Sequence, residues 1–431
     1  MYDILIKGEQ GLPNMRRYNS TINFKKEVNT MRDFFHNYDP VFFVSHIDGD
    51  CLNNKEGVLK DGALYITAKV KAADNAVITI NGIPAEYNEE EHTYSATLPL
   101  YNYRNTLCAI DTKNGYRAEI VVFWLREAID KFYFTVDDCV LFLYELTKYP
   151  EKYPSLFDHH FLAPFKKAHE LYGAHVHLNL YYEFNDESAE DFAEHKEYFN
   201  LTMMTDRYRK EWEENADWLT LSYHAHANYP DMPNKHQSGE FIADSLRKVH
   251  KEILRFAGPK SLIPATTAHW GNGYIEPLRA FREGGYLIQF GSFRQIDNDE
   301  AYLSYYGRDG LPAYLRGAGL DAYNNKSDAE EGSQGRDVWR DNKEDIYYCH
   351  TDMVLNNNKG IPTENIETWM DEYMALRPES GIMGLMIHEE YYYSDYVNYI
   401  PDCGERVLKA IKHIYDKGYR SCPIENIILE Y

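Results

Sequence analysis

Two patterns of hydrophobic and polar positions divide the chain near residue 126. Between residues 40 and 125, short apolar runs alternate with polar positions, and Asn-Gly pairs follow or separate several runs. This alternation with two-residue turn signals is typical of antiparallel strands joined by tight hairpins. We therefore predict a small β-sandwich in this part of the chain. Its strands are expected at residues 41–45, 63–70, 77–80, 106–111 and 118–125.

After residue 130 the pattern changes to short apolar strands that alternate with amphipathic helices. Apolar residues recur at helical spacing in four stretches, residues 156–172, 241–257, 366–376 and 407–415. The strand patterns end near Asp137, Tyr181, His224, His269, Phe290, Asp352 and His388. Seven strand–helix units in about 300 residues predict a (β/α)7 barrel, in which catalytic groups gather at the C-terminal ends of the strands.

The chain is thus expected to be an α/β protein, a distorted (β/α)7 barrel preceded by a small β-sandwich. We place an N-terminal arm at residues 1–35, the sandwich at 36–126 and the barrel at 127–431. Residues 77–87 resemble the immunoglobulin-like modules that accompany many carbohydrate-active enzymes, so the sandwich is predicted to be immunoglobulin-like. Residues 294–345 are polar and rich in Gly, Asp and Asn, which predicts a long loop over a site.

Composition and charge exclude several classes of partner. Lys and Arg number 45 against 68 Asp and Glu, a formal net charge of −23, which argues against binding to nucleic acid or to an anionic membrane. The sequence contains no apolar run long enough for a membrane span and no signal-peptide pattern at its start. The six cysteines are scattered without a CxxC pair. We expect a cytoplasmic protein, or a secreted one if a leader was removed.

The most informative segment is residues 132–138, where a buried-strand pattern ends in Asp137 and Asp138. Neighbouring residues on a strand point to opposite faces, but where a strand ends the chain turns and both side chains can face one pocket. Two carboxylates held together repel each other, so they persist only if a cation, usually a metal ion, compensates their charge. The pair therefore predicts additional metal ligands elsewhere in the chain.

Five of the seven predicted strand ends carry aspartate or histidine. They are Asp137-Asp138, His224-Ala-His226, His269-Trp270, His350-Thr-Asp352 and His388-Glu-Glu390. A single histidine at a strand end is usually structural, but five such ends at one barrel mouth favour a shared site. A carboxylate with two imidazoles is an expected ligand set for Zn²⁺ or a similar divalent ion, with one position open for water.

Residues 130–431 resemble the polysaccharide deacetylase family, the NodB-like carbohydrate esterases. In that family a Thr-Phe-Asp-Asp motif ends the first strand, and its two aspartates are the general base and a metal ligand. The segment Thr135-Val-Asp-Asp138 matches three of these four positions. The resemblance implies that Asp137 is the base and that Asp138 binds a divalent metal, for which zinc is the expectation.

The family's second motif departs from its usual form in this chain. Two histidines four residues apart bind the metal in the family, and here His224 is followed by Asn228 at that spacing. His226 is nearby at a spacing that the family does not use. His269 stands where the family usually has an arginine motif that orients the base. We favour His269 as the third ligand and leave Asn228 and His226 as alternatives.

The family's last motif, Leu-x-His, supplies the general acid. The segment Leu385-Met-Ile-His388 contains one extra residue, and the resemblance implies that His388 is the acid. Trp270 and Glu389 directly follow strand ends and are the candidate substrate-binding residues. Trp270 offers a flat face for a sugar ring.

The resemblance implies metal-dependent deacetylation of an acetylated carbohydrate, with Asp137 taking a proton and His388 donating one. Two alternatives remain open. One is a glycosidase on a related barrel that uses Asp137 with Glu389 or Glu390 as its carboxylate pair. The other is a catalytically inactive relative that binds carbohydrate, which the missing second histidine of the family motif favours.

Overall fold

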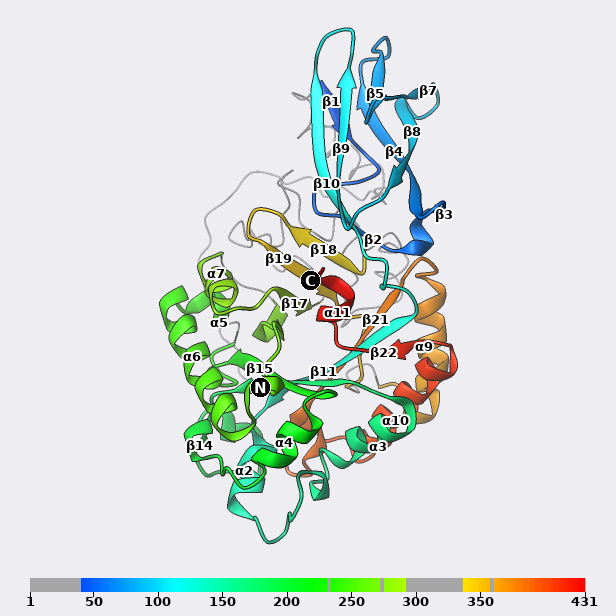
Figure 1. Cartoon of the computed structure of the whole chain (residues 1–431). Helices are drawn as coiled ribbons and strands as arrows, with labels where there is room; N and C mark the ends of the chain where they lie inside the picture. Colours follow the sequence, from blue (N-terminus) through cyan, green and yellow to red (C-terminus); the bar gives the residue numbers. More distant parts are fainter. Residues whose placement is uncertain (1–39, 232, 272–274, 292–335, 357–359, 431) are drawn as a thin grey trace, which may run out of the picture. The chain divides into compact units, whose positions relative to one another are not determined.

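The computed structural model describes residues 40–430 apart from residues 232, 272–274, 292–335 and 357–359. The described residues belong to one compact unit. The predicted N-terminal arm lies outside the described residues, and so does most of the predicted loop at 294–345 (Figure 1).

Short strands between residues 41 and 124 form two five-stranded sheets. One has the order β1-β4-β8-β7 with β3 beside β4, and the other has the order β2-β10-β9-β5-β6. All of their pairings are antiparallel except β2 with β10. The strands are β1 (Val41–Phe43), β2 (Cys51–Leu52), β3 (Val58–Lys60), β4 (Ala63–Ala72), β5 (Ile78–Ile80), β6 (Ile83–Pro84), β7 (Glu86–Asn88), β8 (Thr93–Leu100), β9 (Arg104–Asp111) and β10 (Arg117–Trp124).

One hydrophobic core joins these two sheets. Leu64 and Ile66 of β4 and Leu98 of β8 contribute to it from the first sheet, and Leu107 of β9 and Trp124 of β10 contribute from the second. The alternation along each strand places these side chains on the inner faces. An immunoglobulin-like relationship of these two sheets stays a prediction.

The region after residue 130 is mixed α/β, as predicted (Figure 1). One sheet has the order β15-β12-β11-β21-β20, with β22 (Arg420–Ser421) beside β11, and another has the order β16-β17-β19-β18. A parallel bridge between Leu221 and Leu262 connects β15 with the segment before β16. The parallel strands, in chain order, are β11 (Lys131–Cys139), β12 (Val176–Tyr181), β15 (Leu219–Ala225), β16 (Ala265–Thr267), β17 (Ile288–Gly291), β19 (Ile346–His350) with its continuation β20 (Met353–Val354), and β21 (Ile382–His388). This succession is the one expected for a seven-stranded parallel barrel.

Helices alternate with the strands of this region, and a last short helix follows β22. They are α2 (Leu141–Lys148), α3 (Ala163–Tyr172), α4 (Arg209–Asn215), α5 (Pro233–His236), α6 (Gly239–Phe256), α7 (Ile275–Glu283), α9 (Ile366–Ala375), α10 (Cys403–Asp416) and α11 (Glu425–Ile428). Short antiparallel strands also occur, namely β13 (Glu183–Phe184) with β14 (Phe199–Asn200), and β18 (Val338–Asp341) with β19. No helix among the described residues has the length and apolar character needed to cross a membrane.

On β11 and β12, apolar side chains face the helices, and polar side chains alternate with them. On β11, Phe134 and Val136 belong to the large hydrophobic cluster shared with the helices, and the polar residues Thr135 and Asp137 alternate with them. The same alternation on β12 separates Leu178 and Leu180 from His177, Asn179 and Tyr181. A strand whose inner positions are polar is stable only if those groups find hydrogen-bond partners, and most of them do so across the strands.

Asp352 lies close to the end of the sixth parallel strand, where it was expected. The strand β19 ends at His350, and Met353 and Val354 of β20 then pair with β21. The carboxylate of Asp352 accepts a hydrogen bond from the backbone of Gly384 at 2.6 Å and forms a buried ion pair with Arg377. His350-Thr-Asp352 therefore belongs to the structural interior, and Asn356 is the polar residue that follows the strand end.

Candidate metal centre

A local irregularity at the end of β11 sets the direction of the two adjacent carboxylates. The pairing of β11 with β12 shifts register between Val136 and Cys139, and Asp138 has a φ of 62°. This left-handed conformation is uncommon for residues other than glycine, and aspartate tolerates it better than most. Both carboxylates are buried and interact with His224 and His388.

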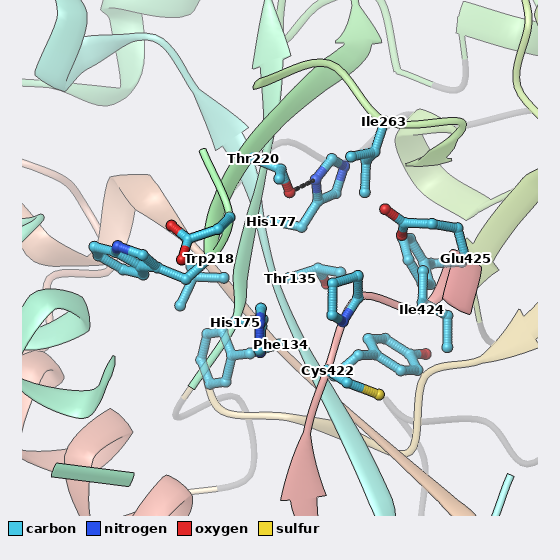
Figure 2. Close-up of a pocket in the computed structure, with 15 residues that line it drawn as sticks. Phe134, Thr135, His175, His177, Trp218, Thr220, Ile263, Cys422, Ile424 and Glu425 are labelled. Atoms are coloured by element: carbon cyan, nitrogen blue, oxygen red, sulfur yellow. Dashed lines mark hydrogen bonds between the residues drawn. The ribbon is translucent and has the colours of Figure 1, made fainter. Parts of the chain in front are cut away.

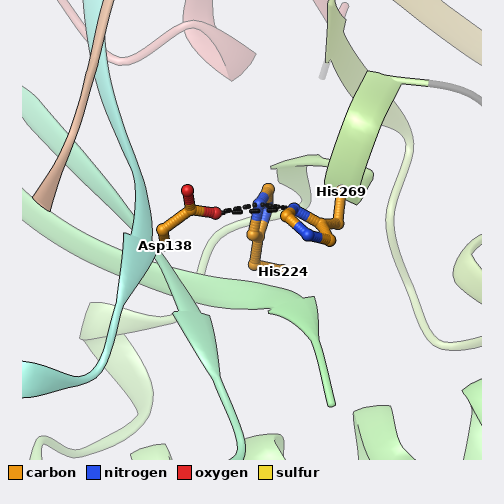
Figure 3. A group of neighbouring side chains, drawn as sticks. All are labelled: Asp138, His224 and His269. Atoms are coloured by element: carbon orange, nitrogen blue, oxygen red, sulfur yellow. Dashed lines mark hydrogen bonds and ion pairs between the residues drawn. The ribbon is translucent and has the colours of Figure 1, made fainter. Parts of the chain in front are cut away.

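Asp138, His224 and His269 come together from β11, β15 and the turn after β16 (Figure 3). The Asp138 Oδ1 atom lies 3.1 Å from His224 Nε2 and 3.4 Å from His269 Nδ1, and the two ring nitrogens are 2.9 Å apart. Ligand atoms of a tetrahedral Zn²⁺ ion, each about 2.0–2.1 Å from the metal, are about 3.3 Å from one another. The three atoms are therefore spaced as three corners of such a site.

Backbone carbonyls determine which ring nitrogens face this centre. The Nδ1 atom of His224 lies 2.7 Å from the carbonyl oxygen of Thr267, and Nε2 of His269 lies 3.0 Å from that of Asn228. A carbonyl only accepts, so each of these nitrogens carries a hydrogen, and the opposite nitrogen of each neutral ring presents a lone pair. Ligand histidines in metal sites are usually held by such second hydrogen bonds. The residues present thus fit a divalent cation.

The charges around the centre also call for a cation. Among the described residues, no lysine or arginine nitrogen lies within 4.0 Å of the Asp137 or Asp138 carboxylate. Burial raises the pKa of Asp137, whereas for Asp138 the neighbouring histidines outweigh burial and lower the pKa. Burial would lower the pKa of His224, but the two carboxylates outweigh it and raise that pKa; burial lowers the pKa of His269 to about 3.

His388 stands at the end of β21, beside the two carboxylates. Its Nε2 atom lies 3.7 Å from Asp138 Oδ2. The backbone N–H of His388 donates to Asn356 Oδ1 at 3.2 Å, which turns the amide nitrogen of Asn356 toward His388 Nδ1 at 2.7 Å. Because that amide nitrogen donates, Nδ1 accepts, and the neutral ring carries its hydrogen on Nε2, facing the site.

Of the alternatives for the third position, His269 is the residue that joins Asp138 and His224. His226 lies elsewhere, with Nδ1 at 2.9 Å from Ser245 Oγ and Nε2 at 3.6 Å from Glu183. Asn228 contributes its backbone carbonyl to His269, and its side-chain oxygen lies 3.1 Å from the hydroxyl of Tyr181.

Tyr181 is a neighbour of the centre that the sequence analysis noted as a strand end without assigning it a role. Its hydroxyl donates a short hydrogen bond to Asp138 Oδ1 and lies 3.2 Å from His269 Nδ1. Asn179, two residues earlier on the same face of β12, donates to Asp137 Oδ1 at 2.6 Å. The alternation His175, His177, Asn179 and Tyr181 along one strand face was the signal that could have identified both.

Glu389 does not lie where it could bind a substrate. It is fully buried, and its carboxylate accepts hydrogen bonds from the backbone N–H groups of Val140, Leu141 and Phe142 and from the hydroxyl of Tyr393. These groups include the N-terminus of α2, where a carboxylate is favoured by unpaired N–H groups and by the helix dipole. The geometry therefore argues against the predicted role in substrate binding and removes one carboxylate from the glycosidase alternative.

Trp270 directly follows His269 and is 49% exposed. Its φ is 66°, a second left-handed backbone at the centre besides that of Asp138. A residue keeps such a strained backbone conformation only where the surrounding structure holds it in place, and these residues cluster at functional sites. The exposure and position of Trp270 are compatible with the predicted contact to a sugar.

A second group of acidic and imidazole side chains, Glu145 with His159 and His160, also has atoms within reach of one ion. In this group, however, Glu145 and His159 already accept hydrogen bonds from neighbouring residues. Glu145 accepts hydrogen bonds from the hydroxyl of Tyr153 at 2.8 Å and from His159 Nε2 at 2.9 Å, while His195 Nε2 lies 3.3 Å from it. The backbone N–H of Phe161 donates to the other nitrogen of His159. This network satisfies itself without a metal.

No family model matches the chain, and no curated protein matches its sequence. Solved structures that it matches include polysaccharide deacetylases of the CE4 family. A CE4 family pseudoenzyme from Bacillus anthracis aligns at 10% identity and a TM-score of 0.35, over 70% of this chain and 66% of that one. A peptidoglycan N-acetylglucosamine deacetylase aligns at 10% identity and a TM-score of 0.33, over 69% and 88%. The carbohydrate deacetylase Agd3 aligns at 6% identity and a TM-score of 0.36, over 94% and 75%. With TM-scores below 0.5, these matches do not establish an activity for this chain.

Proposed function

We propose that the protein is a metal-dependent hydrolase that removes acetyl groups from a carbohydrate. The observation that carries this proposal is the convergence of three lone-pair atoms, Asp138 Oδ1, His224 Nε2 and His269 Nδ1, beside a second buried carboxylate, Asp137. The choice of deacetylation and of carbohydrate rests on the resemblance of Thr135-Val-Asp-Asp138 and His388 to the deacetylase motifs.

In this proposal Asp138, His224 and His269 hold a divalent ion, for which zinc suits the oxygen and nitrogen donors. Bound there, the ion would acidify a water molecule and polarise an acyl carbonyl. Asp137 is the general base: burial raises its pKa, which strengthens it as a proton acceptor near neutral pH. His388 is the general acid: in its imidazolium form the ring donates the Nε2 proton to the leaving amine or alkoxide and becomes the neutral imidazole. Trp270 provides a flat, partly exposed face against which a sugar ring can pack.

Metal analysis of purified variants tests the first part of the proposal. We expect Asp138→Ala, His224→Ala and His269→Ala to lose the metal that the wild type retains after dialysis. His226→Ala is the matched control, because His226 is next to His224 in sequence but bonds to Ser245. Unchanged metal content in all three ligand variants would refute a metal centre at this place.

Acetate release from acetylated oligosaccharides tests the reaction. We expect release by the wild type and a loss of at least about 100-fold in kcat for Asp137→Asn, which keeps the shape of the side chain and removes the base. The metal content of Asp137→Asn should equal that of the wild type. Activity that survives this substitution would remove Asp137 as the base.

A catalytically inactive, carbohydrate-binding relative is the second candidate, and the position of Tyr181 favours it. The Tyr181 hydroxyl bonds to Asp138 Oδ1 and lies 3.2 Å from His269 Nδ1, among the atoms that would surround the ion. A hydroxyl at that place competes with water for access to the metal. Binding of acetylated sugar without acetate release, together with release gained in Tyr181→Phe, would favour this second candidate.

A further inference from the structure

A hydrogen-bonded network inside the barrel ends at Asp137, and Asn179 is its centre. Asn179 is fully buried on β12. Its amide nitrogen donates to Asp137 Oδ1 at 2.6 Å and to Thr267 Oγ1 at 3.2 Å. Its amide oxygen accepts from Ser222 Oγ at 2.6 Å and from the backbone N–H of Thr267 at 3.3 Å. It also lies 3.1 Å from Thr266 Oγ1, whose hydrogen goes to the backbone carbonyl of Tyr223.

The orientation of the Asn179 amide follows from these partners. The backbone N–H of Thr267 can only donate, so the atom that it faces is the amide oxygen. The amide nitrogen is therefore turned toward Asp137, whose ionised carboxylate can only accept. The two neighbours with fixed roles, the Thr267 N–H and the Asp137 carboxylate, thus require the same orientation of the amide.

The network continues from Asn179 along the paired strands β12 and β15, toward their N-terminal ends. Because Ser222 donates its hydrogen to Asn179, its oxygen accepts from His177 Nε2 at 2.9 Å. The other ring nitrogen of His177 then accepts from the hydroxyl of Thr220 at 2.8 Å (Figure 2). Burial lowers the pKa of His177 to about 3, so the ring is neutral, with one nitrogen donating and one accepting. His177 and Thr220 line a pocket, so the chain of hydrogen bonds runs from that pocket to Asp137.

We propose that Asn179 is a positioning residue that orients Asp137, and that Ser222 and His177 hold Asn179 in place. This inference rests on the proposed function, because it takes Asp137 to be the general base. The hydrogen bond occupies Oδ1 of Asp137, and among the described residues Oδ2 receives none, so Oδ2 is the oxygen left to accept a proton. A neutral amide orients the carboxylate without neutralising it, unlike the arginine that the sequence resemblance led us to look for.

Two substitutions of Asn179 separate its roles. Asn179→Asp keeps the volume but replaces the N–H donor by an oxygen that repels Asp137, and Asn179→Ala removes the amide altogether. We expect both to retain wild-type metal content and KM within about threefold, and to lose about 100-fold in kcat, the cost of misplacing a catalytic group by about 1 Å. Asn53→Asp is the matched control, since it makes the same change at a buried asparagine that bonds to the backbone of Glu379; its kcat should be unchanged.

A crystal structure of metal-bound Asn179→Ala gives a readout that does not depend on turnover. We expect the Asp137 carboxylate to rotate away from its wild-type direction while Asp138, His224 and His269 stay in place. An Asp137 that keeps its direction, or a kcat within twofold of the wild type, would overturn the inference, and so would loss of metal in both Asn179 variants. If the wild type releases no acetate but Asp137 rotates, the positioning role stands and the deacetylase proposal fails by itself.

Discussion

The Nε2 atom of His224 lies 2.9 Å from the Nδ1 atom of His269, although both are lone-pair nitrogens in the neutral tautomers that two backbone carbonyls impose. Asp138 Oδ1 is within 3.4 Å of both nitrogens. Three acceptors this close are compatible only with a shared positive charge, either a proton on a histidine or a metal ion. The carboxylates raise the pKa of His224 although burial would lower it, which also shows that the centre favours a positive charge.

The identity of the third ligand can be tested by comparing three variants. His269→Ala should lose the metal, whereas Asn228→Ala should keep it because the carbonyl that holds His269 belongs to the backbone. His226→Ala should also keep it, because this ring bonds to Ser245. Dissociation constants from competition with a coloured chelator provide the measurement. Metal loss in His226→Ala with retention in His269→Ala would reverse the assignment.

The hydroxyl of Tyr181 should tune the metal site. Tyr181→Phe removes the hydrogen bond to Asp138 Oδ1 while preserving the aromatic ring. Hydrogen bonds to metal ligands typically contribute about 10- to 100-fold in affinity, so we expect metal binding to weaken by about tenfold without being abolished. Titration calorimetry on the metal-free variant measures this change. An unchanged affinity would show that the hydroxyl does not support Asp138 in the metal-bound protein.

Glu389 should contribute to stability and not to metal binding. Glu389→Ala leaves the N–H groups of Val140, Leu141 and Phe142 and the hydroxyl of Tyr393 without their acceptor. Each buried donor left unpaired costs about 1–3 kcal/mol, so the free energy of unfolding should fall by about 3 kcal/mol or more. Glu389→Gln, which keeps one acceptor oxygen, should lose less. Chemical denaturation checks both values, and a stable Glu389→Ala variant with a raised KM would restore the predicted substrate role.

Arg377 should be a structural residue that fixes the sixth strand. It is buried and pairs with Asp352 and Asp337. Removing one member of a buried ion pair leaves an uncompensated charge and costs about 3–5 kcal/mol. Arg377→Met should therefore lower the free energy of unfolding by this amount, while the metal content of the folded fraction stays that of the wild type. A large loss of metal at wild-type stability would instead place Asp352 in the functional site.

His195 should make stability depend on pH. Burial alone would lower its pKa, but hydrogen bonds to Glu145 and Asp395 outweigh burial and raise it above the ordinary value. A histidine whose pKa is raised in the folded state stabilises that state fully below its unfolded pKa of about 6.5, and this contribution is lost as the pH rises through the folded pKa.

The variant His195→Gln isolates this contribution. The wild type should exceed the variant in free energy of unfolding by more at about pH 6 than at about pH 9. Urea denaturation of both proteins at the two pH values gives the difference. An equal difference at both values would mean that His195 stays neutral in the folded protein.

Local patterns in the sequence were sufficient for much of the fold. Alternating apolar positions located β1, β4, β5, β9 and β10, five of the ten strands of the two sheets. The other five were not predicted, among them β8 (Thr93–Leu100), which pairs with β4 over seven positions. The helices α6, α9 and α10 lie where helical spacing indicated. The structural role of Asp352 could not be predicted, because its partner Arg377 lies 25 residues later in the chain.

The sequence by itself determined which chemistry was available, namely two adjacent carboxylates at a strand end and several histidines at others, because residue type and periodicity are local properties. Only the tertiary structure decided which of these groups meet. Whether His269 or His226 reaches Asp138 depends on where β15 and β16 bring their backbones, and those positions follow from packing between residues far apart in sequence. The roles of Asn179, Asn356 and Glu389 were decided in the same way, since each depends on a hydrogen-bond partner on another strand or helix.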